Sequence, residues 1–230
     1  MSQITLKMCY MNAGGSRTIS VLITIALLVL GANAQQQAPS RHTETFTAPD
    51  HSFRFSYPSD PRDSQVCTKG KIQPCMGSFI PVCEQDALVC VTYAPQEFKD
   101  TSFSMASFQV REIFASGEQM TADICATPYP RDHGTPSQYP EFLISAEHPV
   151  GLIGGVQFIH GINGGAATGH DFGVDLYRAF HKQRCFELSV SETGTNPMIS
   201  DPPMKTLTPA QQKELDQTMS DILHSFQFTK

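Results

Sequence analysis

The sequence predicts an α+β fold: an antiparallel β-sheet meander, a C-terminal helix packed on it, and an irregular insertion stapled by disulfides. Three observations lead to this class. Apolar and polar residues alternate in several short segments, short turns join consecutive segments, and the last twenty or so residues carry apolar side chains at helical spacing. Consecutive strands joined by short turns pair in antiparallel fashion. The absence of Trp, with 16 Gly and 16 Pro, also suits a turn-rich sheet.

The N-terminal segment predicts export. Arg17 precedes an apolar run over residues 19–30, which is shorter than the ~20 residues that cross a bilayer. The run ends at Ala32-Asn33-Ala34, the small-x-small pattern after which signal peptidases cut. We therefore expect a periplasmic or extracellular protein that has no stable membrane insertion once the signal has been removed.

This interpretation fixes the domain boundaries. Residues 1–34 form the predicted signal peptide, with cleavage between Ala34 and Gln35, and residues 35–42 form a flexible leader. Residues 43–230 form one α+β domain. An uncleaved anchor or a buried core helix is the alternative for the apolar run, and translation from Met1 or from Met11 fits the pattern.

The charge balance excludes two classes of partner. The full chain carries a formal net charge of -6, and removal of Lys7 and Arg17 with the signal leaves 14 basic against 22 acidic residues, or -8. No run of Lys or Arg remains. Since phosphate backbones and anionic membranes are bound by clustered cations, neither nucleic acid nor a membrane surface is an expected partner.

The cysteine count predicts three disulfides. Six cysteines remain beyond the signal, an even number in an exported chain, and they are Cys67, Cys75, Cys83, Cys90, Cys125 and Cys185. Six cysteines allow 15 pairings; the simplest partition pairs the first four locally and joins the distant two. Zinc sites need close pairs such as Cys-x-x-Cys, which these spacings lack, so no metal or other cofactor is expected.

The strands and the links between them follow from local patterns. The cysteine-rich stretch 58–86 has no period and is interpreted as the irregular insertion, and the small residues 163–167 are interpreted as a hairpin link. A helical turn is expected near 118–125, and a proline-rich loop over 127–140. The predicted strands lie near residues 53–57, 87–93, 106–111, 142–146, 156–162, 171–180 and 186–190.

The C-terminal helix has the most complete pattern. Thr208 suits the N-cap, Pro209 the first helical position and Gln211 the third position of a capping box. One apolar stripe then follows at helical spacing, through Leu215, Met219, Ile222, Leu223 and Phe226. The stripe predicts a helix that packs on the sheet.

No catalytic motif accompanies this fold, so no catalytic residue is predicted. The chain has no Gly-x-Ser-x-Gly elbow, no His-Glu-x-x-His and no phosphate loop. The remaining candidate is a ligand face formed by side chains on neighbouring predicted strands: His160, His170, Asp171 and His181. Isolated strand histidines are more often partly exposed side chains without a shared role.

Two stretches resemble the PsbP-like domains, the fold of the photosystem II extrinsic protein. Residues 52–58, Ser-Phe-Arg-Phe-Ser-Tyr-Pro, are similar to the opening strand of that family. Residues 222–228, Ile-Leu-His-Ser-Phe-Gln-Phe, are similar to its last helix, which runs into a short strand. The resemblance implies an antiparallel sheet covered by helices and a non-enzymatic binding or assembly role. The cysteine-rich segment departs from the family pattern.

These observations favour an exported non-enzymatic protein that binds or assembles with an unknown protein or small ligand. One alternative is a secreted or periplasmic hydrolase that uses the His and Asp side chains of the neighbouring strands. Another is a structural protein of the cell envelope.

Overall fold

The computed structural model describes residues 42–69, 83–114, 119–126, 143–144, 150–167, 169–199 and 201–229. All of them belong to one of the two units into which the chain divides, residues 40–230. The predicted signal peptide, its cleavage site at Ala34 and Gln35, residues 35–41 of the leader, Cys75 and the proline-rich loop lie outside the described residues.

The main sheet has eight strands, and a smaller sheet has three. In the main sheet the path runs β3-β4-β5-β10-β9-β8-β6, with β7 pairing off this path with β8. Every pair in both sheets is antiparallel. The strands are β3 (Ser64–Thr68), β4 (Val89–Tyr93), β5 (Phe103–Ile113), β6 (Leu143–Ile144), β7 (Val150–Ile153), β8 (Val156–Ala167), β9 (His170–His181) and β10 (Arg184–Thr195).

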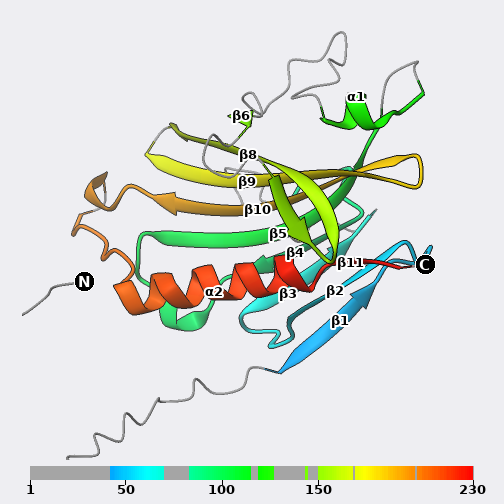
Figure 1. The fold of residues 1–230 in the computed structure, drawn as a ribbon. Coiled ribbons are helices and arrows are strands. Elements are labelled where there is room, and N and C mark those ends of the chain that lie inside the picture. The colour runs from blue at the N-terminus through cyan, green and yellow to red at the C-terminus, as the bar shows by residue number, and fades with distance from the viewer. Residues whose placement is uncertain are drawn as a thin grey trace, which may run out of the picture. The chain divides into compact units, whose positions relative to one another are not determined.

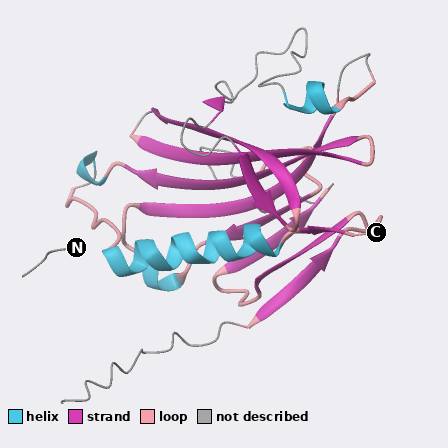
Figure 2. Ribbon diagram, in the orientation of Figure 1, coloured by secondary structure: helices cyan, strands magenta, loops and turns pink. Residues whose placement is uncertain are grey.

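The smaller sheet joins the two ends of the domain. Its order is β1 (Thr43–Thr47), β2 (Phe53–Pro58) and β11 (Gln227–Phe228). The helices are α1 (Ala122–Ala126) and α2 (Pro209–Ser225), with short 3-10 turns at Gln96–Phe98 and Pro197–Ile199 (Figures 1 and 2). The predicted α+β class is therefore confirmed: α2 packs on an antiparallel sheet and runs alongside its long strands (Figure 1).

The sequence pattern places α2 correctly. The Thr208 hydroxyl accepts a hydrogen bond from the Gln211 backbone N–H at 3.3 Å, and the Gln211 side chain accepts one from the Thr208 N–H at 2.9 Å. This is the predicted capping box. The apolar stripe is buried against β2 of the small sheet and β5, β7 and β10 of the large one. Rings from both sheets complete the core, including Phe53, Phe55, Phe108, Phe158, Phe186 and Phe226.

Three features of the sheet differ from the expectation. Residues 163–167 extend β8 as a strand and do not form a link, because their backbones pair with the start of β9. The predicted irregular insertion contains β3, whose five residues include too few apolar side chains to show a strand period. The meander also forms in two parts, β3-β4-β5 and β8-β9-β10, which join where β5 pairs with β10.

The two disulfides among the described residues agree with the simplest partition of the cysteines. Cys83 is joined to Cys90, and Cys125 to Cys185. Cys67 is disulfide-bonded as well. The bond between Cys125 and Cys185 joins α1 to the first residues of β10.

Removal of the N-cap provides a first test of α2. Thr208→Ala leaves the N–H of Gln211 without its acceptor, so we expect the free energy of unfolding to fall by ~1 kcal/mol. Thr208→Ser keeps a hydroxyl acceptor and is the matched control, expected within a few tenths of a kcal/mol of wild type. Urea midpoints measured with disulfides intact compare the two. Equal midpoints for Ala and Ser would show that the capping box contributes nothing.

Candidate functional site

The two faces of the main sheet differ in chemistry. The face toward α2 carries mostly apolar side chains, such as Phe108, Phe186 and Leu188, and all three are buried. On this face α2 packs against β5, β7 and β10, and its contacts with β8 and β9 are fewer. A groove lies between α2 and the strands β8, β9 and β10.

The floor of the groove is open at Gly173 of β9. Gly164 on β8 pairs with Gly173 on β9, so neither strand places a side chain there. A Cβ built on Gly173 would meet no atom within 4 Å. The glycine-rich segment that looks like a flexible link in the sequence thus pairs with β9 beside this open position.

We call this groove the α2 groove, and it consists of two adjoining cavities. The first, of about 470 Å³, has a floor from the three strands: Ile162, Asp175, Tyr177, Val190 and Glu192. Its wall is one side of α2: Leu215, Asp216, Met219, Leu223 and His224. The second, of about 500 Å³, shares Gly173 and Glu192 with the first and continues past Asp171 toward Phe103 and Leu207. Volumes of this size suit small organic ligands.

Carboxylates are the charged groups of the α2 groove. The amide nitrogen of Gln212 donates to Asp216 at 2.9 Å and to Glu192 at 3.4 Å, so these two carboxylates lie on either side of one amide. Asp171 lies near Glu192: its Oδ1 would be 2.8 Å from a Cβ on Gly194, two residues further along β10, and its charge acts on Glu192. Burial raises the pKa of Glu192, and the charges of Asp216 and Asp171 raise it further.

His160 belongs to the rim of this groove. Its ring stacks on Tyr177 with centroids 4.5 Å apart and planes 8° apart, and its Nε2 lies 2.6 Å from Oδ1 of Asp175. Burial and the neighbouring charge of Asp175 raise the pKa of Tyr177 to about 12. His160, Asp175 and Tyr177 therefore form one connected group on β8 and β9.

The structure does not bring the four candidate residues together. Asp171 lines the second cavity, at the end of β9 away from His181. His170 starts β9 and lies on the opposite face from Asp171, with its Nδ1 3.3 Å from the Thr195 hydroxyl. His181 ends β9 about 35 Å from His170 at strand spacing, and stacks on Phe228 with centroids 4.1 Å apart. Only His160 and Asp171 contribute to the α2 groove or its rim.

Sequence reasoning missed the groove residues on other elements. Glu192 and Asp216 are 24 positions apart and become neighbours only because α2 packs beside β10. The one available indication was the period of α2, which places Asp216 next to the buried stripe. Among the described residues, no three metal-ligating side chains are grouped closely enough to hold an ion.

The opposite face of the sheet carries a buried ion network. Glu187 on β10 pairs in register with Arg111 on β5 and Arg178 on β9, with one carboxylate oxygen 2.6 Å from each Nε. Arg111 also pairs with Glu84. Burial alone would raise the pKa of Glu187, but Arg111 and Arg178 outweigh it and lower that pKa.

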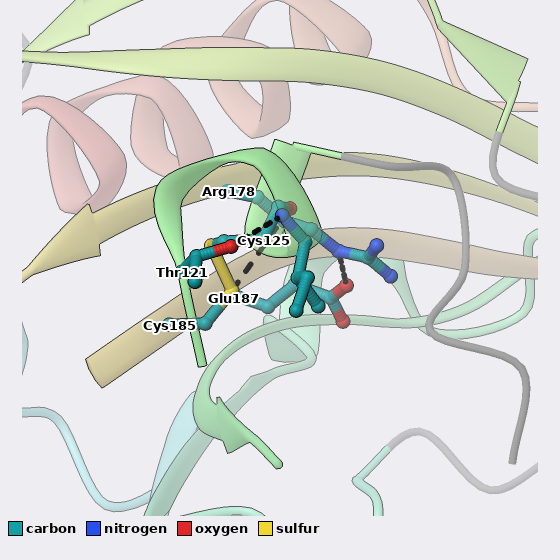
Figure 3. Close-up of a disulfide and its surroundings, with 6 residues drawn as sticks. Thr121, Cys125, Arg178, Cys185 and Glu187 are labelled. Atoms are coloured by element: carbon teal, nitrogen blue, oxygen red, sulfur yellow. Dashed lines mark hydrogen bonds and ion pairs between the residues drawn. A yellow bond between two sulfur atoms is a disulfide. The ribbon is translucent and has the colours of Figure 1, made fainter. Parts of the chain in front are cut away.

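This network adjoins a disulfide. Figure 3 shows Cys125 bonded to Cys185, with Glu187 and Arg178 beside the bond. Glu84, at the other end of the network, has a pKa raised to about 7, because its burial outweighs the attraction of Arg111. Since these groups satisfy one another and are closed off, we assign the network a structural role.

Comparison with known proteins adds little to this site. No protein-family model and no curated protein matches the sequence. Among solved structures, the chain is similar to LpqN, a protein involved in cell envelope biogenesis of Mycobacterium tuberculosis, with 9% identity and a TM-score of 0.40 over 82% of this chain and 91% of that one. A protein of Bacteroides thetaiotaomicron VPI-5482 is similar with 11% identity and a TM-score of 0.38.

The second of these similarities covers 81% of this chain and 48% of the other, so the chain spans about half the length of that protein. At such TM-scores neither similarity supports a statement about function, and the site is argued from its own residues. In the part of the chain that the structure describes, no helix has the length and apolar character needed to cross a membrane.

Proposed function

We propose that this chain is an exported, disulfide-bonded protein that binds a ligand in the α2 groove. The observation that carries the proposal is the open sheet floor at Gly173, shared by two cavities of about 470 and 500 Å³. Ligand sites are concave, mostly apolar and equipped with a few polar groups. The α2 groove has these properties, with Ile162, Val190 and Met219 among its apolar lining residues.

Export is supported by the sequence and by the redox chemistry. Disulfides persist in oxidising compartments, and Cys83–Cys90 and Cys125–Cys185 are both formed. The hydrolase alternative draws on His160, His170 and His181, which do not assemble into one site among the described residues. We therefore propose binding as the role of the groove.

A blocked groove tests this function. Gly173→Phe places a ring in the open space above β9, and the strand backbone there does not require glycine. We expect the uncharged apolar fluorophore N-phenyl-1-naphthylamine to bind the purified disulfide-bonded protein, and the variant to lose at least ~90% of the fluorescence increase.

Thr45→Phe is the matched control, since it adds the same ring to the exposed strand β1, away from the groove. It should bind the fluorophore like wild type. Thermal melts establish that both variants fold. Full fluorophore binding by folded Gly173→Phe, or none by wild type, would overturn the groove as the binding site.

A further inference from the structure

We infer that the ligand of the α2 groove is an amphiphilic organic cation, with its apolar part on the lining of the groove and its positive group among the carboxylates. This inference rests on the proposed function and names the ligand class for the same site. Two independent features carry it: the apolar lining, and a local excess of carboxylates that no Lys or Arg among the described lining residues balances.

The charge excess is specific to the groove. Elsewhere in the described structure, carboxylates within the fold are paired with Arg: Glu187 with Arg111 and Arg178, and Glu112 with Arg184 at 2.6 Å. Glu192, Asp216 and Asp171 have no such partner in the described part of the chain. The polar contacts of Glu192 and Asp216 come from the neutral amide of Gln212.

Acidic residues dominate the charged groups of the lining, which also includes His224. Of the described residues that line the two cavities, four are Asp or Glu and none is Lys or Arg. Low-dielectric walls concentrate the field of such groups and raise the local concentration of a ligand of opposite sign. The raised pKa of Glu192 agrees with this, because burial and the charges of Asp216 and Asp171 disfavour its ionised form, and a bound cation would favour it.

The remaining lining fits the apolar part of such a ligand. Ile162 keeps 46% of its surface exposed at the edge of the groove, and Val190, Leu215 and Met219 continue the apolar surface inward. The ring of Tyr177, which stacks on His160, adds further apolar surface beside Asp175. A simple inorganic cation would leave the apolar surface unused.

A series of probes that differ only in the head group tests the charge preference. Octylammonium, octan-1-ol and octanoate compete with N-phenyl-1-naphthylamine at pH 7 and low salt. We expect octylammonium to displace the fluorophore at a concentration at least ~10-fold lower than octanoate, with octanol between them. Spermidine, a cation without an apolar chain, should compete more weakly than octylammonium.

Charge variants locate the effect. Asp175→Asn and Glu192→Gln each remove one negative charge from the groove. Each should weaken the binding of octylammonium several-fold and leave the binding of octan-1-ol unchanged. Asp221→Asn is the matched control: this exposed residue on α2 accepts a hydrogen bond from Gln217 and does not line either cavity. It should leave octylammonium competition unchanged.

The possible failures separate the two proposals. If the fluorophore does not bind, or folded Gly173→Phe binds it, the groove itself is wrong. If the fluorophore binds as expected but octanoate competes as well as octylammonium, the groove stands and the cationic ligand is overturned. Spermidine competing as strongly as octylammonium would overturn the proposal that the ligand has an apolar part. If Asp221→Asn weakened octylammonium binding as much as Glu192→Gln, the effect would come from the overall charge of the protein, and the assignment of the cation to the groove carboxylates would be overturned.

Discussion

Replacing Glu187 with Gln is expected to lower the free energy of unfolding by about 3–5 kcal/mol. The side chain is fully buried, and its two oxygens accept hydrogen bonds from Arg111 and Arg178. Gln has the same shape but no charge, so the variant leaves two buried guanidinium groups with too little negative charge beside them. Removing one partner from a buried ion pair is costly for this reason. Denaturant midpoints with disulfides intact measure the loss.

Glu84→Gln is the control within the same network. Its carboxyl also pairs with Arg111, but burial raises its pKa to about 7, so its ionised form is held less firmly than that of Glu187, whose pKa is lowered. We expect Glu84→Gln to cost ~1 kcal/mol or less. If Glu187→Gln costs no more than Glu84→Gln, the charge on Glu187 does not hold the sheet together.

The cost of the network suggests what it does in the fold. Glu187 faces one Arg on each neighbouring strand, in register, so any slip of β10 by one residue would separate all three charges. β5 and β10 are far apart in the sequence and join the two parts of the sheet. A buried ion set at this junction fixes a register that apolar packing alone would specify less sharply.

Local patterns were sufficient for some parts of the structure. The cap at Thr208 and the stripe that includes Leu215 and Ile222 placed α2, because capping and helical period depend on neighbours three and four residues away. The alternation of Phe53, Phe55 and Tyr57 placed β2 in the same way. Each of these features is encoded within one segment.

The parts that were missed depend on residues far apart in the chain. Residues 163–167 lack side chains large enough to show a strand period, yet their backbones pair with β9. The α2 groove is missed for the same reason, since Asp175, Glu192 and Asp216 come from three elements. The four candidate residues share neighbouring strands in sequence, but strand length separates His170 from His181. Only the register and the helix position reveal which side chains meet.

Loss of the bond between Cys125 and Cys185 should destabilise the protein more than loss of the bond between Cys83 and Cys90. The first closes a loop of 60 residues and the second a loop of 7. On the chain-entropy model, which is one account of disulfide stabilisation, these loops correspond to ~4 and ~2 kcal/mol. The longer loop gains more because it removes more conformations from the unfolded chain.

Paired alanine variants make the comparison direct. Cys125→Ala with Cys185→Ala opens the long loop, and Cys83→Ala with Cys90→Ala opens the short one. All four residues are at most 2% exposed, so both variants remove similar buried sulfur atoms and their difference reports mainly the loop. The variant that lacks the Cys83–Cys90 bond should have the higher urea midpoint of the two. A larger loss in the Cys83–Cys90 pair would contradict the loop argument and would assign the stabilisation to local packing, because that bond lies beside Glu84 at the end of the ion network.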